Sequence, residues 1–263
     1  MNLDDDYANA AYIKNAASFP QMWADRAAIF REHNYCELGV AYGLGERQTM
    51  DLFFPKQAPK GLFVFVHGGY WLKFDRSSWS HLAGAAISRG WAVAIPSYDL
   101  APKARIFEMT LQIAQAVTVA AEKVAGPIAL AGHSAGGQLV ARMVCPGVLG
   151  ENVVNRLTQV VPISPVSDLR PLMHTSMNSD LKLDEKECAS ESPALLLPRD
   201  GLPVTVWVGA DERPVFLAQS KQLADAWECD CVTAVGKHHF DVLEPLEDPN
   251  SVLSRLLLCV QEA

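Results

Sequence analysis

Residues 128–143 read Ile-Ala-Leu-Ala-Gly-His-Ser-Ala-Gly-Gly-Gln-Leu-Val-Ala-Arg-Met, and this stretch decides the fold. A short apolar run is followed by Gly-x-Ser-x-Gly and then by a segment of helical composition. A strand, a sharp turn and a helix in this order place Ser134 on a nucleophile elbow, where the glycines leave room for a tight backbone. Ser134 is therefore the candidate nucleophile, and His133 is expected to support the turn. The alternative is a tight turn with an incidental serine.

Similar apolar runs recur along the chain and alternate with longer segments of helical period. Such runs suit parallel strands covered on both faces, so the alternation predicts an α/β fold with a mainly parallel sheet. Helical faces span 106–124 and 252–260, and the first 34 or so residues look helical beyond Pro20. Residues 50–54 are expected to form an earlier edge strand. The remaining expected strands are 62–66, 92–95, 128–131, 159–163, 204–208 and 231–235.

A second informative stretch is HGGYW at residues 67–71, directly after an expected strand. Ligand sites in open α/β sheets form at the carboxyl ends of the strands. Adjacent glycines let backbone N–H groups point into such a site without a Cβ in the way, so Gly68 and Gly69, with the N–H of Ala135, are predicted to form an oxyanion hole. His67 is expected to brace this loop. The alternative is a Gly-Gly turn beside core aromatic residues.

An acid and then a histidine should follow the serine, because a nucleophile elbow of this type is accompanied by Asp or Glu and then His in chain order. Two later apolar runs end in these residue types. Glu212 is the candidate acid, with Asp211 as the alternative, and His239 is the candidate base, with His238 as a solvated neighbour. In such a triad the histidine takes the serine proton and returns it to the leaving group, while the acid orients the imidazole.

Composition narrows the function classes. The 263 residues carry 22 basic and 30 acidic side chains, a net charge of −8, which disfavours nucleic acid and anionic membranes as partners. One domain over residues 1–263 is expected, because no linker or repeat interrupts the chain. The acidic start, the short apolar runs and six scattered cysteines favour a cytoplasmic protein with reduced thiols. No metal-ligand spacing occurs, so neither a metal nor a cofactor is expected.

These motifs resemble one family, the kynurenine formamidase (arylformamidase) branch of the α/β-hydrolases, which has HGGYW where the hormone-sensitive-lipase group has HGGG. The resemblance covers most of the chain and includes residues 97–100, 164–172 and 213–220. It implies the α/β-hydrolase fold, an acid three residues after the glycine that ends its strand, and a histidine directly before a phenylalanine. These positions are Glu212 and His239. The sequence departs from the family at Val215, where relatives usually carry an acid.

The resemblance also implies a substrate and a pocket. The motifs predict a serine hydrolase that cleaves a small amide or ester through an acyl-enzyme. The resemblance implies formyl as the acyl group and the arylamine of kynurenine as the leaving group. Tyr70, Trp71 and Phe240 are expected near an aromatic ligand, under a helical cap formed by the N-terminal segment and an insertion at 170–198. The alternatives are a short-chain carboxylesterase with the same triad and a catalytically silent α/β-hydrolase that serves as a binding module. The sequence leaves open whether the protein forms a homodimer.

Overall fold

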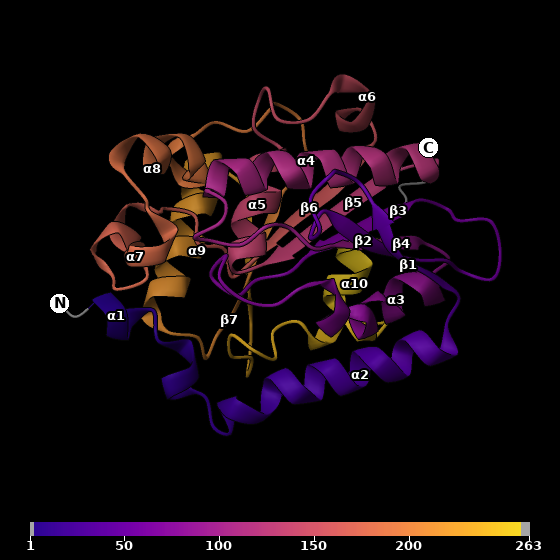
Figure 1. The fold of residues 1–263 in the computed structure, drawn as a ribbon, viewed down its shortest axis with the longest axis horizontal. Helices are drawn as coiled ribbons and strands as arrows, with labels where there is room; N and C mark the ends of the chain where they lie inside the picture. Colours follow the sequence, from indigo (N-terminus) through magenta and orange to yellow (C-terminus); the bar gives the residue numbers. More distant parts are fainter. Residues whose placement is uncertain (1–2, 259–263) are drawn as a thin grey trace.

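The computed structural model describes residues 3–258 and is built on one eight-stranded sheet, in the order β1-β2-β4-β3-β5-β6-β7-β8 (Figure 1). Strand β2 pairs antiparallel with β1 and β4, and all other neighbours pair in parallel. The carboxyl ends of the parallel strands therefore meet at one edge of the sheet. The strands are β1 (Cys36–Ala41), β2 (Thr49–Phe53), β3 (Leu62–Val66), β4 (Ala92–Pro96), β5 (Ile128–His133), β6 (Leu157–Ile163), β7 (Thr205–Gly209) and β8 (Asp230–Ala234).

Helices cover both faces of this sheet (Figure 1). One face carries α4 (Ile106–Lys123), α5 (Ala135–Met143) and α9 (Pro214–Trp227), and the other carries α2 (Phe19–His33), α3 (Gly84–Ser88) and α10 (Val252–Leu257). Short α-helices are α1 (Leu3–Asp6), α6 (Glu151–Val154), α7 (Asn178–Leu181) and α8 (Glu185–Glu191). The 3₁₀ turns span Asn9–Tyr12, Ala16–Ser18, Arg76–Ser78, Ser80–Ala83, Arg170–His174, Pro193–Leu195 and Glu244–Glu247.

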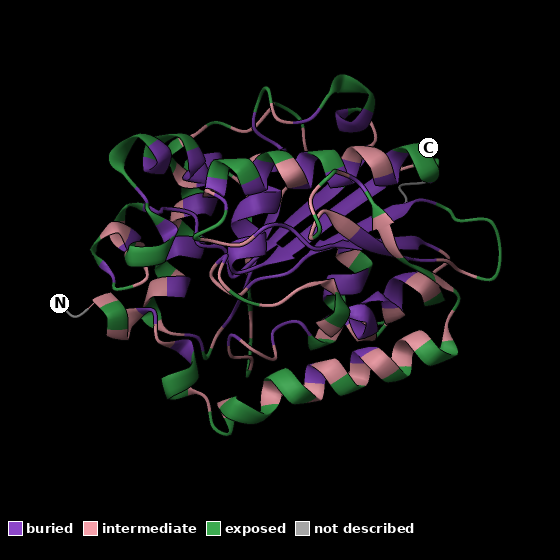
Figure 2. Ribbon diagram, viewed as in Figure 1, coloured by how far each residue is buried: buried purple, intermediate pink, exposed green. Residues whose placement is uncertain are grey.

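The hydrophobic core lies in two layers separated by the sheet. In β3, Leu62 and Val64 belong to the layer under α4 and α5, while Phe63 and Phe65 belong to the layer under α2 and α10. Figure 2 shows the central strands buried and the outward faces of the helices exposed. This two-sided burial explains why the central strands read as continuous apolar runs, and it confirms the predicted α/β fold.

The edge of the sheet differs from the sequence prediction. Strand β2 was expected at the edge, but β1 pairs with its outer side and forms the edge itself. No apolar run marks β1, because its side chains are half-buried or exposed and its pairing is irregular between Glu37 and Val40, where Gly39 has φ +67°. Helix α2 carries Pro20 in its first turn, as predicted. Helix α10 ends at Leu257, and residues 259 and 260 of the predicted run, Cys259 among them, lie outside the described residues.

Of the helices within residues 3–258, none combines the length and the apolar character that crossing a bilayer requires. The five cysteines in this range are all free thiols. The single-domain organisation stays a prediction.

One buried histidine leads to a prediction about acid stability. His81, in the 3₁₀ turn Ser80–Ala83 beside α2, is 5% exposed, and its Nδ1 has no hydrogen-bond partner within the described part of the chain. Burial lowers the pKa of His81 from 6.5 to about 3. The unfolded chain therefore takes up a proton at this residue near pH 6.5, whereas the folded chain does not, so stability falls as the pH drops below about 6.5.

Between pH 7 and pH 5, the unfolding free energy of His81→Leu should fall by about 2 kcal/mol less than that of the wild type. Other buried histidines are common to both proteins and cancel in this difference when they lie far from the substitution. Urea unfolding at the two pH values measures it. Equal losses in the two proteins would show that His81 titrates normally in the folded state.

Candidate active site

Ser134 occupies a strained turn between β5 and α5. Its backbone has φ +55° and ψ −113°, and its N–H donates to the Ile163 carbonyl at 2.8 Å. The flanking glycines permit this turn because a Cβ on Gly136 would lie 2.1 Å from the Val66 carbonyl oxygen. A Cβ on Gly132 would lie equally close, 2.1 Å from the Gly136 oxygen. The Gly-x-Ser-x-Gly pattern is thus required by close packing of β5, α5 and β3.

Glu212 follows β7 and turns back toward the strand end. Its Oε2 lies 2.5 Å from His239 Nδ1, and its Oε1 accepts hydrogen bonds from the Ser164 hydroxyl and, at 2.9 Å, from the Gly209 N–H. Burial raises the pKa of this carboxyl, but the neighbouring His239 and the accepted hydrogen bonds outweigh burial and hold the pKa below its ordinary value. Glu212 is therefore an ionised, hydrogen-bonded partner of the imidazole.

Asp211 does not occupy the same place. It is exposed, its backbone N–H donates to the Lys237 carbonyl at 2.9 Å, and His239 pairs with Glu212 instead. Of the two acids left open by the sequence, the structure brings Glu212 to the histidine.

His239 follows β8, and its ring lies close to two other rings. Phe216 lies 4.3 Å from it and His133 lies 4.5 Å from it, measured between ring centroids. Because ionised Glu212 can only accept, Nδ1 carries the hydrogen and Nε2 is left free to accept one. Both His239 and Ser134 line the same cavity. Over the described range 3–258 no hydrogen bond joins Ser134 Oγ to His239, and such bonds often tighten only when substrate binds.

His238, the neighbouring histidine, has a different role. Its Nδ1 accepts from the backbone N–H groups of Phe240 at 3.1 Å and Asp241 at 3.3 Å, and its ring is half-buried. These contacts shape the turn that carries His239.

The predicted oxyanion-hole amides lie at two adjacent strand ends. Gly68 and Gly69 follow β3, and Ala135 is the first residue of α5. Within residues 3–258, the backbone N–H groups of these three residues donate no hydrogen bond to the protein. A Cβ on Gly68 would lie 3.0 Å from the Ser134 Cβ, so the loop passes directly beside the elbow. Three free donors next to a serine hydroxyl can hold a negatively charged oxygen.

The two other histidines of this region are structural. Burial lowers the pKa of His67 to about 4, and its Nδ1 lies 2.8 Å from the Gly68 carbonyl. Its ring stacks on Tyr98 at 4.5 Å, and the Tyr98 hydroxyl donates to the His67 carbonyl. Burial likewise lowers the pKa of His133 well below its ordinary value. Both rings therefore stay neutral and brace the loops beside Ser134.

A cavity of about 900 Å³ opens above Ser134 and His239. Tyr70 and Phe240 line it, but Trp71 does not. Tyr70 and Trp71 both have a positive φ, 54° and 57°, and Trp71 is fully buried in the core, where its Nε1 donates to Gln138 at 3.2 Å. The prediction that Trp71 faces the ligand is corrected: the turn directs it into the protein interior. The other aromatic lining residues are Tyr7, Trp23, Phe74 and Trp79.

The cap over this cavity comes mainly from the N-terminal segment. The residues of the N-terminal segment that line the cavity are Tyr7, Ala8, Asn9, Ala10, Ala11, Ala16, Ala17, Pro20 and Trp23. From the segment 170–198, which the structure describes in full, Met177 alone contributes. Sequence reasoning did not single out Tyr7, Asn9 or Ser164 as site residues, because their roles depend on contacts with distant segments. Between residues 3 and 258, no cluster of three or more His, Cys, Asp or Glu side chains is arranged to hold a metal ion.

Comparisons with known proteins show which family the chain resembles. A family model described as the alpha/beta hydrolase fold matches residues 63–228. A kynurenine formamidase of Drosophila melanogaster is 32% identical over 244 residues, covering 83% of this chain and 79% of its own. A kynurenine formamidase of Salmo salar is 28% identical over 236 residues, covering 84% of this chain and 80% of its own.

Solved structures show the same fold. A crystal structure from Silicibacter sp. tm1040, provisionally described as a thioesterase, is 56% identical with a TM-score of 0.96 and covers 98% of this chain and 100% of that one. Esterase B of Lactobacillus rhamnosis has a TM-score of 0.69 at 20% identity and covers 96% of this chain and 93% of its own, a likeness that concerns the fold alone. Given the family match and the relatives, the chain belongs to the α/β-hydrolase family and is a hydrolase of its kynurenine-formamidase-like branch.

Proposed function

We propose that the protein is a serine hydrolase that cleaves the formyl group from an aryl formamide such as N-formylkynurenine. The observation that carries the proposal is the pairing of Glu212 with His239 on the wall of the cavity that also contains the elbow serine. Ser134 acts as nucleophile, His239 as general base and acid, and Glu212 as the group that orients the imidazole.

The proposed reaction follows from the proton that each of these side chains can give or accept. His239 Nε2 takes the Ser134 hydroxyl proton while Oγ attacks the formyl carbon, and ionised Glu212 stabilises the imidazolium that forms. The N–H groups of Gly69 and Ala135, with Gly68, receive the negative charge on the carbonyl oxygen. When the C–N bond breaks, His239 gives its proton to the departing amine. A water molecule then attacks the formyl-serine by the same route and releases formate.

Two observations support an aryl formamide as the substrate. Relatives that align with most of the chain are named kynurenine formamidases, and the cavity is lined by aromatic side chains from several segments. Tyr70 stands directly after the oxyanion glycines, where it can limit the space for the acyl group. An aromatic leaving group can then lie against Trp23, Phe74 and Phe240.

A short-chain carboxylesterase with the same triad is the second candidate. It is favoured by the 56% identical relative, because that protein is provisionally described as a thioesterase and thioesters pass through the same acyl-enzyme chemistry. Metal independence and a cytoplasmic location stay predictions, and the oligomeric state stays open.

Hydrolysis of matched substrates tests the proposal. A formyl pocket that excludes even one methyl group discriminates by about 10- to 200-fold, so we expect kcat/KM for N-formylkynurenine to exceed that for p-nitrophenyl acetate at least about tenfold, after correction for the activated nitrophenol. p-Nitrophenyl butyrate should be worse than the acetate. Steady-state kinetics with the purified protein measure these ratios. If the formamide is untouched while butyryl esters are hydrolysed rapidly, the carboxylesterase candidate replaces the formamidase.

A further inference from the structure

Asn9 lies where the N-terminal segment meets the catalytic histidine. It is 5% exposed and begins the 3₁₀ turn Asn9–Tyr12. It lines the main cavity and also a second cavity of about 210 Å³, and His239 lines the same two cavities. Asn9 is therefore a neutral polar side chain that shares both cavities with the imidazole, in a main-cavity wall that is otherwise mostly apolar.

The orientation of the Asn9 amide is set by Tyr70. Burial raises the pKa of the Tyr70 hydroxyl well above its ordinary value, so the group keeps its single hydrogen. That hydrogen is donated to the Tyr7 carbonyl at 2.7 Å. The contact of 3.4 Å between the Tyr70 hydroxyl and Asn9 must then have the Asn9 Nδ2 group as its donor. The Asn9 oxygen, Oδ1, is left shielded from water and has no hydrogen-bond partner among residues 3–258.

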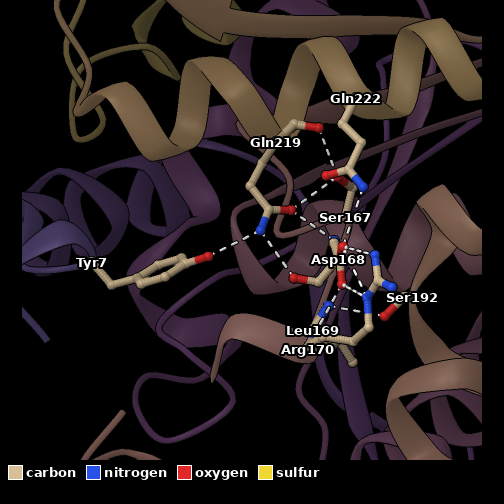
Figure 3. A network of polar contacts seen from close by, with 8 residues as sticks. All are labelled: Tyr7, Ser167, Asp168, Leu169, Arg170, Ser192, Gln219 and Gln222. Atoms are coloured by element: carbon tan, nitrogen blue, oxygen red, sulfur yellow. Dashed lines mark hydrogen bonds and ion pairs between the residues drawn. The ribbon is translucent and has the colours of Figure 1, made fainter. Parts of the chain in front are cut away.

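A second set of hydrogen bonds holds this arrangement from α9 (Figure 3). Gln219 Nε2 donates to the Tyr7 hydroxyl at 3.0 Å and to the Asp168 carbonyl at 2.9 Å. Its Oε1 accepts from the Asp168 N–H at 2.7 Å and from the Ser167 hydroxyl at 3.0 Å. Tyr7 also packs edge-on against Phe216, the residue beside His239. The segment that carries Asn9 is therefore fixed to the same scaffold as the catalytic histidine.

We propose that Asn9 is a substrate-binding residue whose Oδ1 accepts a hydrogen bond from the N–H of the scissile amide. The inference rests on the proposed function, because it concerns the leaving group that His239 protonates. An unpaired acceptor shielded from water is costly, so a donor brought by the substrate gains more here than it would at a wet surface. An aryl amide carries this N–H next to the carbonyl carbon, whereas the corresponding ester has an oxygen there and cannot donate. Asn9 thus selects amides over esters of the same shape.

The test compares N-phenylformamide with phenyl formate, which differ at the leaving atom. We expect Asn9→Leu to lower the ratio of kcat/KM for the amide to that for the ester by about tenfold, the effect of losing one hydrogen bond. Asn9→Asp, which keeps an acceptor oxygen, should leave the ratio within about threefold of wild type. A merely structural role would lower both rates together and leave the ratio unchanged in every variant. An unchanged ratio in Asn9→Leu, or an equal fall in both variants, overturns the proposal.

Asn15→Gly is the matched control. It removes another side-chain amide from the same segment, at a residue that lines neither cavity. The φ of +58° at this position suits glycine. The amide-to-ester ratio of kcat/KM in this variant should therefore equal that of wild type. If the wild type hydrolyses no formamide, the proposed function fails independently of Asn9. N-phenylformamide is then measured as an inhibitor of ester hydrolysis, where Asn9→Leu should raise its inhibition constant about tenfold and an unchanged constant overturns the inference.

Discussion

Replacing Ser134 with alanine is expected to lower kcat by a factor of about 10⁴ or more, because removal of a triad nucleophile leaves only binding and the oxyanion hole. Alanine carries the same Cβ as serine, so the strained turn at φ +55° and the packing of its neighbours should be unchanged. The loss should therefore appear in kcat while the thermal unfolding midpoint stays close to that of wild type. Both quantities are measured on the purified variant.

Covalent labelling identifies the nucleophile directly. A fluorophosphonate probe followed by peptide mass analysis should find its label on Ser134 in the wild type and on no residue of Ser134→Ala. Ser88→Ala is the matched control, since Ser88 is exposed on α3 and its hydroxyl donates to the Gly84 carbonyl of the same helix. That variant should keep both the activity and the label. Labelling at another residue, or most of the activity surviving in Ser134→Ala, would remove Ser134 from the mechanism.

The central strands were predictable because each is covered on both faces and so reads as an uninterrupted apolar run. Strand β1 was not, because it lies at the edge and its side chains are only partly buried, with a bulge near Gly39. The other edge strand, β8, is also largely exposed, but its run at 231–235 is apolar enough to be recognised. The buried faces of α4 and α10 were also predictable, because each helix packs one side against the sheet and so carries apolar residues at a helical period.

The site was predictable where a backbone constraint leaves a local pattern. The elbow glycines and the Gly-Gly pair after β3 are such patterns, since a Cβ at these positions would collide with neighbouring backbone. The choice between Glu212 and Asp211 was not local. It depends on the turn after β7, which brings the Glu212 carboxylate back to the Gly209 N–H and so toward His239.

Side-chain direction was the other quantity that the sequence could not supply. Tyr70 and Trp71 are neighbours in one motif, yet successive positive φ values send Trp71 into the core and leave Tyr70 at the cavity. Asn9 and Tyr7 carry no motif at all. They reach the site because hydrogen bonds from Tyr70 and Gln219 hold the N-terminal segment across it, and such pairings over long sequence separations have no local signature.

Replacing His239 with alanine should cost a factor of about 10⁴ or more in kcat, whereas His238→Ala should stay within about tenfold of wild type. His239 pairs with Glu212 Oε2 and shares a cavity with Ser134, so its loss removes the base and takes away the partner of that oxygen. His238 instead accepts two backbone N–H groups of the following turn, so its loss should loosen that turn and reduce stability more than rate.

Chemical rescue separates a lost base from a distorted site. The His239→Ala variant has a gap bounded by the Phe216 and His133 rings and by Glu212, and the neighbouring cavity gives small molecules access to it. Added imidazole should enter this gap, pair with Glu212 and restore part of the activity in a concentration-dependent way. The same imidazole should do nothing for Ser134→Ala, in which no nucleophile is left to activate. If His238→Ala shows the greater loss and imidazole rescues that variant instead, the base is His238 and the pairing of Glu212 with His239 is structural.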